Sequence, residues 1–264
     1  MQNLKDKKIF LFDLDGTLYL GGEPIGDAIN TLKFLRQKGK KIGYITNNSS
    51  RTDDQYEKIL RDIGIFQDGD FIYSSLDATI DYILEHRKND KIFALCPKRV
   101  FNCLKNSGIN VVEEQDGKYA DDLLLAFDTE LTYSKIKLAN ELLNKGAYYI
   151  ATHPDLVCPT KDISIPDVGS FISLLKTSSG RVPDLIIGKP NSLMAEYICT
   201  KYGVCNTDVV MVGDRLSTDI KFGINCNFTT ILVLSGDTDK KTAEDSIVKP
   251  YVIIDDVNCL PKLI

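Results

Sequence analysis

The sequence contains only two histidines, and its seven cysteines are scattered along the chain. A zinc site built from histidines, or from two histidines and two cysteines, is therefore not expected. No two cysteines form a Cys-x-x-Cys motif, and several stand in apolar surroundings. An odd, scattered set of thiols is typical of free cysteines in a reducing cytoplasm. The seven are Cys96, Cys103, Cys158, Cys199, Cys205, Cys226 and Cys259.

Long apolar runs and an excess of one charge are also lacking. No run approaches the roughly 20 apolar residues that a membrane-spanning helix needs, and Asp13 interrupts the apolar stretch that follows the N-terminal lysines. The chain has 32 basic and 37 acidic residues, a formal net charge of −5. We therefore expect a cytoplasmic protein that binds neither membranes nor nucleic acid, whereas small anionic substrates need only a local positive site.

What the sequence does contain is a regular alternation of strand-like and helix-like segments. Continuous apolar runs at 8–12, 40–46 and 208–213 alternate with segments of helical spacing such as 25–39. This pattern predicts an α/β protein whose parallel sheets are covered by helices on both faces. In such folds ligands bind beyond the carboxyl ends of the strands.

The chain length and the pattern of segments predict two domains. Residues 77–180 carry their own strand–helix alternation and are bracketed by strands that end in polar clusters. We expect a discontinuous core domain of residues 1–76 and 181–264, with 77–180 inserted as a second α/β domain. The hinges are expected near Ser75 and near Ser179–Gly180.

The sequence DLDGT begins at Asp13, directly after the first apolar run. Strand alternation points Asp13 and Asp15 to the same side. Two carboxylates this close repel each other unless a cation lies between them or one is protonated, and Mg²⁺ is the usual hard cation at phosphate sites. The alternative is a turn in which Asp and Gly serve only the backbone geometry.

A second acidic motif, GDRLSTD, follows the apolar run at 208–213. It places Asp214 and Asp219 at what we expect to be the same edge of the sheet. Thr218 is the predicted cap of the helix that follows. The alternative interpretation is an ordinary loop followed by a capped helix.

Two further polar segments follow apolar runs. In ITNNSS, Thr46 and Asn47 offer a hydroxyl, an amide and backbone N–H groups that suit phosphate oxygens, although such clusters also cap helices. In IIGKPNS, Lys189 precedes Pro190, the expected first residue of a helix. This lysine is able to neutralise a phosphate and the nearby carboxylates, and the alternative is an ordinary solvated side chain.

Taken in order, these four motifs resemble those of the haloacid dehalogenase (HAD) superfamily, and the resemblance covers essentially the whole chain. The long insert is similar to the type IIA cap of NagD-like and p-nitrophenyl phosphatase-like members. The segments similar to that subfamily are DGTLYLGGEPIGDA, ITNNSSRT, FDTELTYSKI, ATHPD, GKPNSLM and GDRLSTDI. The resemblance implies a HAD-like fold, with a Rossmann-like parallel-sheet core and an inserted α/β cap domain.

The resemblance also implies a mechanism, that of a Mg²⁺-dependent phosphomonoester phosphatase. Asp13 would attack phosphorus and form an aspartyl-phosphate, and Asp15 would protonate the leaving group and then deprotonate water. Mg²⁺ would be held by Asp13, the backbone carbonyl of Asp15 and Asp214, with Asp219 close by. The remaining phosphoryl oxygens would be bound by Thr46, Asn47 and Lys189.

Substrate selectivity is expected in the cap. The resemblance points to HPDLVC, residues 153–158, as the selecting loop, in which many relatives have Asn at the position of His153. The candidate selectivity residues are Asn48, His153, Asp155 and Cys158. The last three have ordinary interpretations as a polar loop residue, a turn former after Pro154 and a buried thiol. The substrates implied are small phosphorylated metabolites such as sugar phosphates and nucleotides, with p-nitrophenyl phosphate as an in vitro substrate, and the protein would be a monomer or a homodimer.

Two alternatives belong to other functional classes. A signalling receiver domain also collects acids, a hydroxyl and a lysine at strand ends, but it is about half this length and lacks the DxDGT order. A HAD-fold binding or regulatory protein without significant turnover would not need the complete motif set that this chain retains. Turnover of p-nitrophenyl phosphate with Mg²⁺ separates these alternatives from a phosphatase.

Overall fold

The computed structural model describes residues 4–160 and 163–264, which form two compact units. The core unit comprises Met1–Thr46, Asp53–Tyr73 and Lys189–Ile264, and the insert unit comprises Asn47–Thr52 and Ser74–Gly188. The insert unit is thus wider than the expected 77–180 segment. It also includes the short segment 47–52, which no pattern in the sequence assigned to it.

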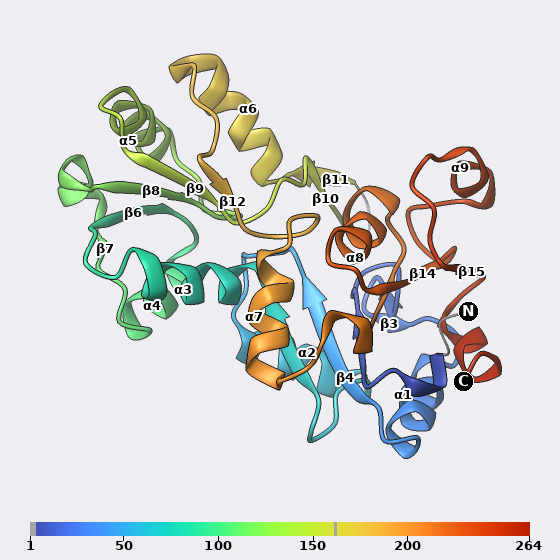
Figure 1. The fold of residues 1–264 in the computed structure, drawn as a ribbon. Coiled ribbons are helices and arrows are strands. Elements are labelled where there is room, and N and C mark those ends of the chain that lie inside the picture. Colours follow the sequence, from blue (N-terminus) through green and yellow to red (C-terminus); the bar gives the residue numbers. More distant parts are fainter. Residues whose placement is uncertain (1–3, 161–162) are drawn as a thin grey trace. The chain divides into compact units, whose positions relative to one another are not determined.

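A six-stranded sheet forms the centre of the core unit (Figure 1). Its strands, in spatial order, are β15 (Val252–Ile254), β14 (Thr229–Val233), β13 (Val209–Gly213), β1 (Ile9–Phe12), β4 (Lys41–Thr46) and β5 (Phe71–Ser74). The strand β1 pairs in parallel with both β13 and β4. Every residue of β1, β13 and β14 is buried, as the continuous apolar runs predicted for a sheet covered on both faces.

The sheet extends from β1 in two opposite directions. The chain first adds β4 and β5 on one side of β1, and later returns to add β13, β14 and β15 on the other. In open α/β sheets, the crevice beyond the carboxyl ends of the strands at such a reversal is the usual ligand site. The segments after β1 and β13 therefore lie where a site is expected.

The helices of the core unit flank this sheet. They are α1 (Ala28–Gln37), α2 (Asp53–Asp62), α7 (Leu193–Tyr202), α8 (Lys221–Asn225) and α9 (Lys240–Asp245), with short helical turns η1 (Leu4–Asp6), η3 (Asn206–Asp208), η4 (Leu216–Ile220) and η5 (Val257–Lys262). A small hairpin, β2 (Tyr19–Leu20) and β3 (Glu23–Pro24), follows the DLDGT segment. The hydrophobic core includes Phe10, Phe12, Leu32, Tyr44 and Val212.

Two local predictions in this unit are wrong. Pro190 does not begin a helix, because α7 starts only at Leu193 and Pro190 lies in the preceding turn. Thr218 does not cap a helix, because it lies inside the π-helical turn η4. In η4 the N–H groups of both Asp219 and Ile220 bond to the carbonyl of Arg215, so the helical path begins before Thr218.

The insert unit is built on a second parallel sheet. Its five strands, in spatial order, are β12 (Leu185–Ile186), β9 (Tyr148–Ala151), β8 (Asp122–Leu125), β6 (Ile92–Leu95) and β7 (Val111–Val112), and each neighbouring pair is parallel. Helices α5 (Tyr133–Asn144) and α6 (Val168–Ser179) lie on one face, and α3 (Ser75–His86) and α4 (Lys98–Asn106) on the other (Figure 1). Both units therefore confirm the predicted α/β class.

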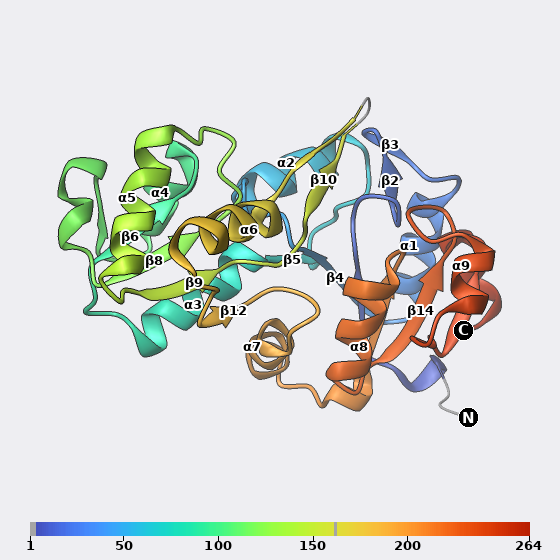
Figure 2. The same cartoon turned by 90° about the horizontal axis from the view of Figure 1, so that it is seen from above.

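Two smaller features complete the insert unit. The helical turn η2 (Glu114–Tyr119) connects β7 to β8, and the antiparallel hairpin of β10 (Val157–Pro159) and β11 (Ser164–Pro166) projects away from the five-stranded sheet (Figure 2). A separate hydrophobic core, including Leu123, Leu125, Leu142 and Tyr149, supports this unit. Within the ranges that the structure describes, no helix is both long enough and apolar enough to cross a bilayer.

Candidate active site

Three carboxylates converge at the carboxyl ends of β1 and β13. Asp13 follows β1 directly, and its N–H donates to the carbonyl of Val212 at 2.9 Å. Asp214 follows β13, and Asp219 comes from η4. One carboxylate oxygen from each of the three lies within 4.8 Å of the others. Asp214 and Asp219 are buried, while the side chain of Asp13 is 15% exposed.

Lys189 is the cation of this cluster. Its ammonium donates to Asp13 Oδ1 at 2.6 Å and to Asp219 Oδ1 at 2.7 Å, and the residue is only 2% exposed. Burial alone would lower the pKa of this lysine, but the two carboxylates raise it above its ordinary value. Lys189 is therefore charged at neutral pH, and it is a structural member of the cluster rather than a solvated surface lysine.

One lysine does not compensate three carboxylates. Burial raises the pKa of Asp13 well above its ordinary value and Asp219 raises it further, although Lys189 opposes both. Burial and the neighbouring Asp219 raise the pKa of Asp214 to about 6. Without a further cation the cluster therefore disfavours ionisation of all three carboxyl groups, and their oxygens are ligands that a hard divalent cation prefers.

The backbone around Asp214 is shaped to hold its carboxylate. Thr17 Oγ1 donates to Asp214 Oδ1 at 3.3 Å, and the N–H of Asp237 donates to Oδ2 at 2.7 Å. A Cβ atom on Gly16 would stand 2.6 Å from Asp214 Oδ2, and one on Gly236 would stand 2.1 Å from it. Gly16 also has φ of +81°, which favours glycine. The Gly-Thr pair of DLDGT thus supports an acid 197 residues further along the chain.

Sequence reasoning missed Thr17, Gly236 and Asp237 as supports of the cluster. Thr17 was visible only as part of a motif, and its partner could not be identified from the sequence. Gly236 and Asp237 lie in SGD, directly after the apolar run of β14. A polar segment after a third buried strand was therefore the available signal.

Two other predicted site residues, Asp15 and Thr46, also belong to the core unit. The carboxylate of Asp15 is exposed and lies outside the three-carboxylate cluster; its Oδ2 accepts a 3.5 Å hydrogen bond from the Tyr19 hydroxyl. Thr46 is the last residue of β4 and is buried. Thr46 is the last residue of the first chain segment of the core unit, and the next residue, Asn47, belongs to the insert unit.

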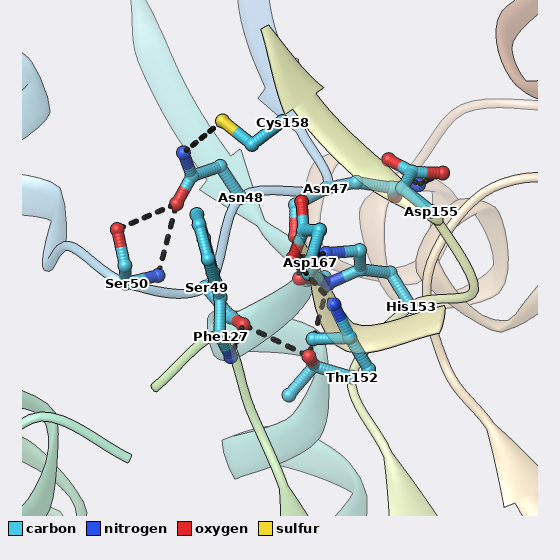
Figure 3. A network of polar contacts seen from close by, with 12 residues as sticks. Asn47, Asn48, Ser49, Ser50, Phe127, Thr152, His153, Asp155, Cys158 and Asp167 are labelled. Carbon is cyan, nitrogen blue, oxygen red and sulfur yellow. Dashed lines mark hydrogen bonds and ion pairs between the residues drawn. The ribbon is translucent and has the colours of Figure 1, made fainter. Parts of the chain in front are cut away.

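The other predicted site residues lie in the insert unit (Figure 3). Asn47 Nδ2 donates to both carboxylate oxygens of Asp155, at 3.2 and 3.1 Å. Asn48 uses its side-chain oxygen to accept bonds from Ser50, and its amide lies 3.9 Å from Cys158 Sγ. His153 is fully buried. A selectivity role for these residues stays a prediction.

Comparison with known proteins agrees with the motifs. Residues 10–110 match the family described as haloacid dehalogenase-like hydrolase, and residues 186–260 match a HAD-hydrolase-like family. The chain is 31% identical over 252 residues to the 5'-nucleotidase YutF of Bacillus subtilis, covering 96% of each chain. It is also 31% identical over 255 residues to the acid sugar phosphatase of Staphylococcus aureus, covering 97% of each. The structure of a 4-nitrophenylphosphatase from Thermotoga maritima superposes with a TM-score of 0.93 at 37% identity, covering 98% of both chains.

The chain therefore belongs to the haloacid dehalogenase-like hydrolases, and it is a phosphoric monoester hydrolase similar to the p-nitrophenyl phosphatases. The predicted superfamily, fold and enzyme class are confirmed. The alternative of a receiver domain is excluded, because the similarity to these phosphatases extends over both units of the chain.

Proposed function

We propose that this protein is a Mg²⁺-dependent phosphatase of small phosphorylated metabolites and that it works through an aspartyl-phosphate on Asp13. The observation that carries the proposal is the pairing of Asp13 with the buried Lys189 beside two further acids, Asp214 and Asp219. This arrangement holds one carboxylate at the end of β1 and leaves the cluster with charge that a divalent cation would balance.

The donor set fits Mg²⁺. Its ligands would be Asp13, the backbone carbonyl of Asp15 and Asp214, with Asp219 bound directly or through water. When bound, Mg²⁺ offsets the repulsion between an anionic nucleophile and an anionic phosphate. The supports of Asp214 from Thr17 and Asp237 keep that ligand oriented before any cation arrives.

The chemical steps are divided between two aspartates. An oxygen of Asp13 forms a bond to phosphorus as the bond to the leaving oxygen breaks, and Asp15 gives its proton to that oxygen. Asp15 then takes a proton from water, which attacks phosphorus and releases Asp13 and inorganic phosphate. The exposure of Asp15 supports this role, because a proton-transfer group needs access to solvent and substrate. Lys189, Thr46 and Asn47 are proposed to bind the phosphoryl oxygens.

The relatives support small phosphomonoesters as the substrate class, since their names cover a nucleotidase, a sugar phosphatase and a p-nitrophenyl phosphatase. We propose that residues 77–180 act as the type IIA cap, and that Asn48, His153, Asp155 and Cys158 are its selectivity candidates. The protein is proposed to be cytoplasmic, in keeping with seven free thiols, and to act as a monomer or homodimer.

Hydrolysis of p-nitrophenyl phosphate tests the proposal. We expect turnover with Mg²⁺, loss of turnover with EDTA and recovery when Mg²⁺ is added in excess. A panel of sugar phosphates and nucleoside monophosphates, ranked by kcat/KM, would then define the preferred class. A folded, Mg²⁺-loaded protein that hydrolyses none of these esters would contradict the proposal and favour a HAD-fold protein without turnover.

Mg²⁺ is expected to stabilise the folded protein. A ligand that binds only the native state adds about 2.7 kcal/mol to the free energy of unfolding at 100 times its Kd, so the melting temperature should rise with Mg²⁺ concentration. Asp214→Asn should abolish most of this rise, because it removes one charged ligand. Asp245→Asn, an exposed aspartate on α9, is the matched control and should respond like the wild type. An equal Mg²⁺ response in the Asp214 variant would contradict this site.

A further inference from the structure

Four buried polar side chains of the insert unit form one continuous chain of hydrogen bonds. The members are Asp167, His153, Thr152 and Ser49, and none is more than 3% exposed. His153 Nε2 lies 3.0 Å from Asp167 Oδ1, and His153 Nδ1 lies 3.0 Å from Thr152 Oγ1. Thr152 Oγ1 in turn lies 2.8 Å from Ser49 Oγ (Figure 3).

One arrangement of protons fits the contacts at both ends of this chain. The carboxylate of Asp167 also accepts from the N–H of Val168 at 2.7 Å, and Ser49 Oγ accepts from the N–H of Phe127 at 2.9 Å. A neutral imidazole that donates from Nε2 to Asp167 leaves Nδ1 as an acceptor for the Thr152 hydroxyl. The Thr152 oxygen then accepts the proton of Ser49. In this arrangement each hydroxyl and each ring nitrogen of the chain has a partner, and its protons point toward Asp167.

We infer that this relay, Asp167–His153–Thr152–Ser49, is a positioning device for the segment 47–50, and that His153 acts through it rather than by touching the substrate. The burial of His153 supports this, because the side chain contacts no solvent. The inference rests on the proposed function, in which the backbone N–H of Asn47 binds a phosphoryl oxygen while its side-chain amide donates to Asp155.

The same stretch of chain holds Asn47 by a second contact. Asp155, two residues after His153, accepts both bonds from Asn47 Nδ2. A carboxylate at this place orients the amide, since only the NH₂ side can face it. The relay holds the side-chain hydroxyl of Ser49, and Asp155 holds the side-chain amide of Asn47. Residues 152–155 therefore position the segment that follows Thr46.

Two substitutions of His153 separate the two halves of the relay. Asn offers a side-chain oxygen near the place of Nδ1 and keeps the bond to Thr152, whereas Gln offers a nitrogen near the place of Nε2 and keeps only the bond to Asp167. We expect His153→Asn to keep kcat/KM within about threefold of wild type, because the Ser49 half survives. His153→Gln and His153→Ala should lower kcat/KM about 10-fold or more, mainly by raising KM.

The loss should be uniform across substrates. The relay acts on a segment proposed to bind the phosphoryl group. The kcat/KM values for p-nitrophenyl phosphate and for a sugar phosphate should therefore fall by the same factor, and inhibition by inorganic phosphate should weaken in parallel. Ser49→Ala should reproduce the effect, and the Ser49→Ala/His153→Ala double variant should be no worse than Ser49→Ala alone. Thr132→Ala is the matched control: it removes the N-cap of α5 in the same unit, and it should lower stability but leave KM unchanged.

Each outcome decides between these interpretations. Thermal denaturation of every variant identifies any that does not fold, and the Asn variant is the arm that keeps the test decisive. If the variants change the ranking of substrates instead of lowering kcat/KM by the same factor for all of them, the relay is overturned and His153 is a selectivity residue. Folded His153→Gln, His153→Ala and Ser49→Ala variants whose KM equals that of the wild type would overturn it as well. Absence of turnover in the wild type would instead overturn the proposed function, and the inference with it.

Discussion

Replacing Asp13 by Asn is expected to abolish turnover while leaving the metal-free protein at least as stable as the wild type. The amide has nearly the shape of the carboxylate but is a far poorer nucleophile, so no aspartyl-phosphate forms. Stability should not fall, because burial and Asp219 already disfavour the charged form of Asp13, as its raised pKa indicates. A neutral side chain removes that repulsion, so the carboxylate of the proposed nucleophile lowers the stability of the metal-free protein.

Two measurements check this prediction: steady-state hydrolysis of p-nitrophenyl phosphate and thermal unfolding in EDTA. Asp245→Asn again provides the control for the change of an aspartate to an amide at an exposed position. An Asp13→Asn protein that retains substantial turnover would exclude Asp13 as the nucleophile. A clear fall in melting temperature would show instead that the pair with Lys189 outweighs the repulsion.

Lys189→Met should be damaging to both stability and activity. Removing one partner of a buried ion pair costs about 3–5 kcal/mol, because the remaining charge is left uncompensated. Here the change would remove the ammonium that pairs with Asp13 and Asp219. We expect a large fall in melting temperature in EDTA and partial recovery with Mg²⁺, which would replace part of the lost positive charge. Activity should fall at least ~100-fold even with Mg²⁺, as expected when a donor to the reacting group is removed.

The matched control for this variant is Lys240→Met on α9, since Lys240 is exposed. That variant should change neither stability nor activity appreciably. Thermal unfolding with and without Mg²⁺, together with kcat at saturating Mg²⁺, separates the two roles of Lys189. A Lys189→Met protein as stable as wild type in EDTA would contradict the central place that the ion pairs give this residue.

The sequence was most informative where chemistry and strand ends coincide. Continuous apolar runs identified β1, β4 and β13 as buried parallel strands, and their carboxyl ends share one edge. That rule predicted Asp13 and Asp214 at the same edge of the sheet, and the structure shows that the two strands before them, β1 and β13, are neighbours. The residue types after these strands also carried the resemblance that the comparisons confirmed.

Contacts between distant segments were beyond the sequence. No pattern showed that Lys189 would be buried between Asp13 and Asp219, or that Gly16 and Gly236 make room for Asp214. The sequence also did not show that residues 47–52 belong to the insert unit. There the Ser49 hydroxyl bonds to the hydroxyl of Thr152 and accepts from the N–H of Phe127. Local periodicity cannot report such pairings, because they depend on which segments the completed fold brings together.

The proposed division of labour between Asp13 and Asp15 is tested most directly by pre-steady-state kinetics of Asp15→Asn with p-nitrophenyl phosphate and Mg²⁺. p-Nitrophenolate is a stable anion that leaves without a proton, so the first step should proceed in this variant. Breakdown of the aspartyl-phosphate needs a base and should stall. We predict a burst of one p-nitrophenolate per enzyme and a phosphoryl group trapped on Asp13, detectable by mass spectrometry. Linear release without a burst, or a phosphoryl group on another residue, would contradict the account.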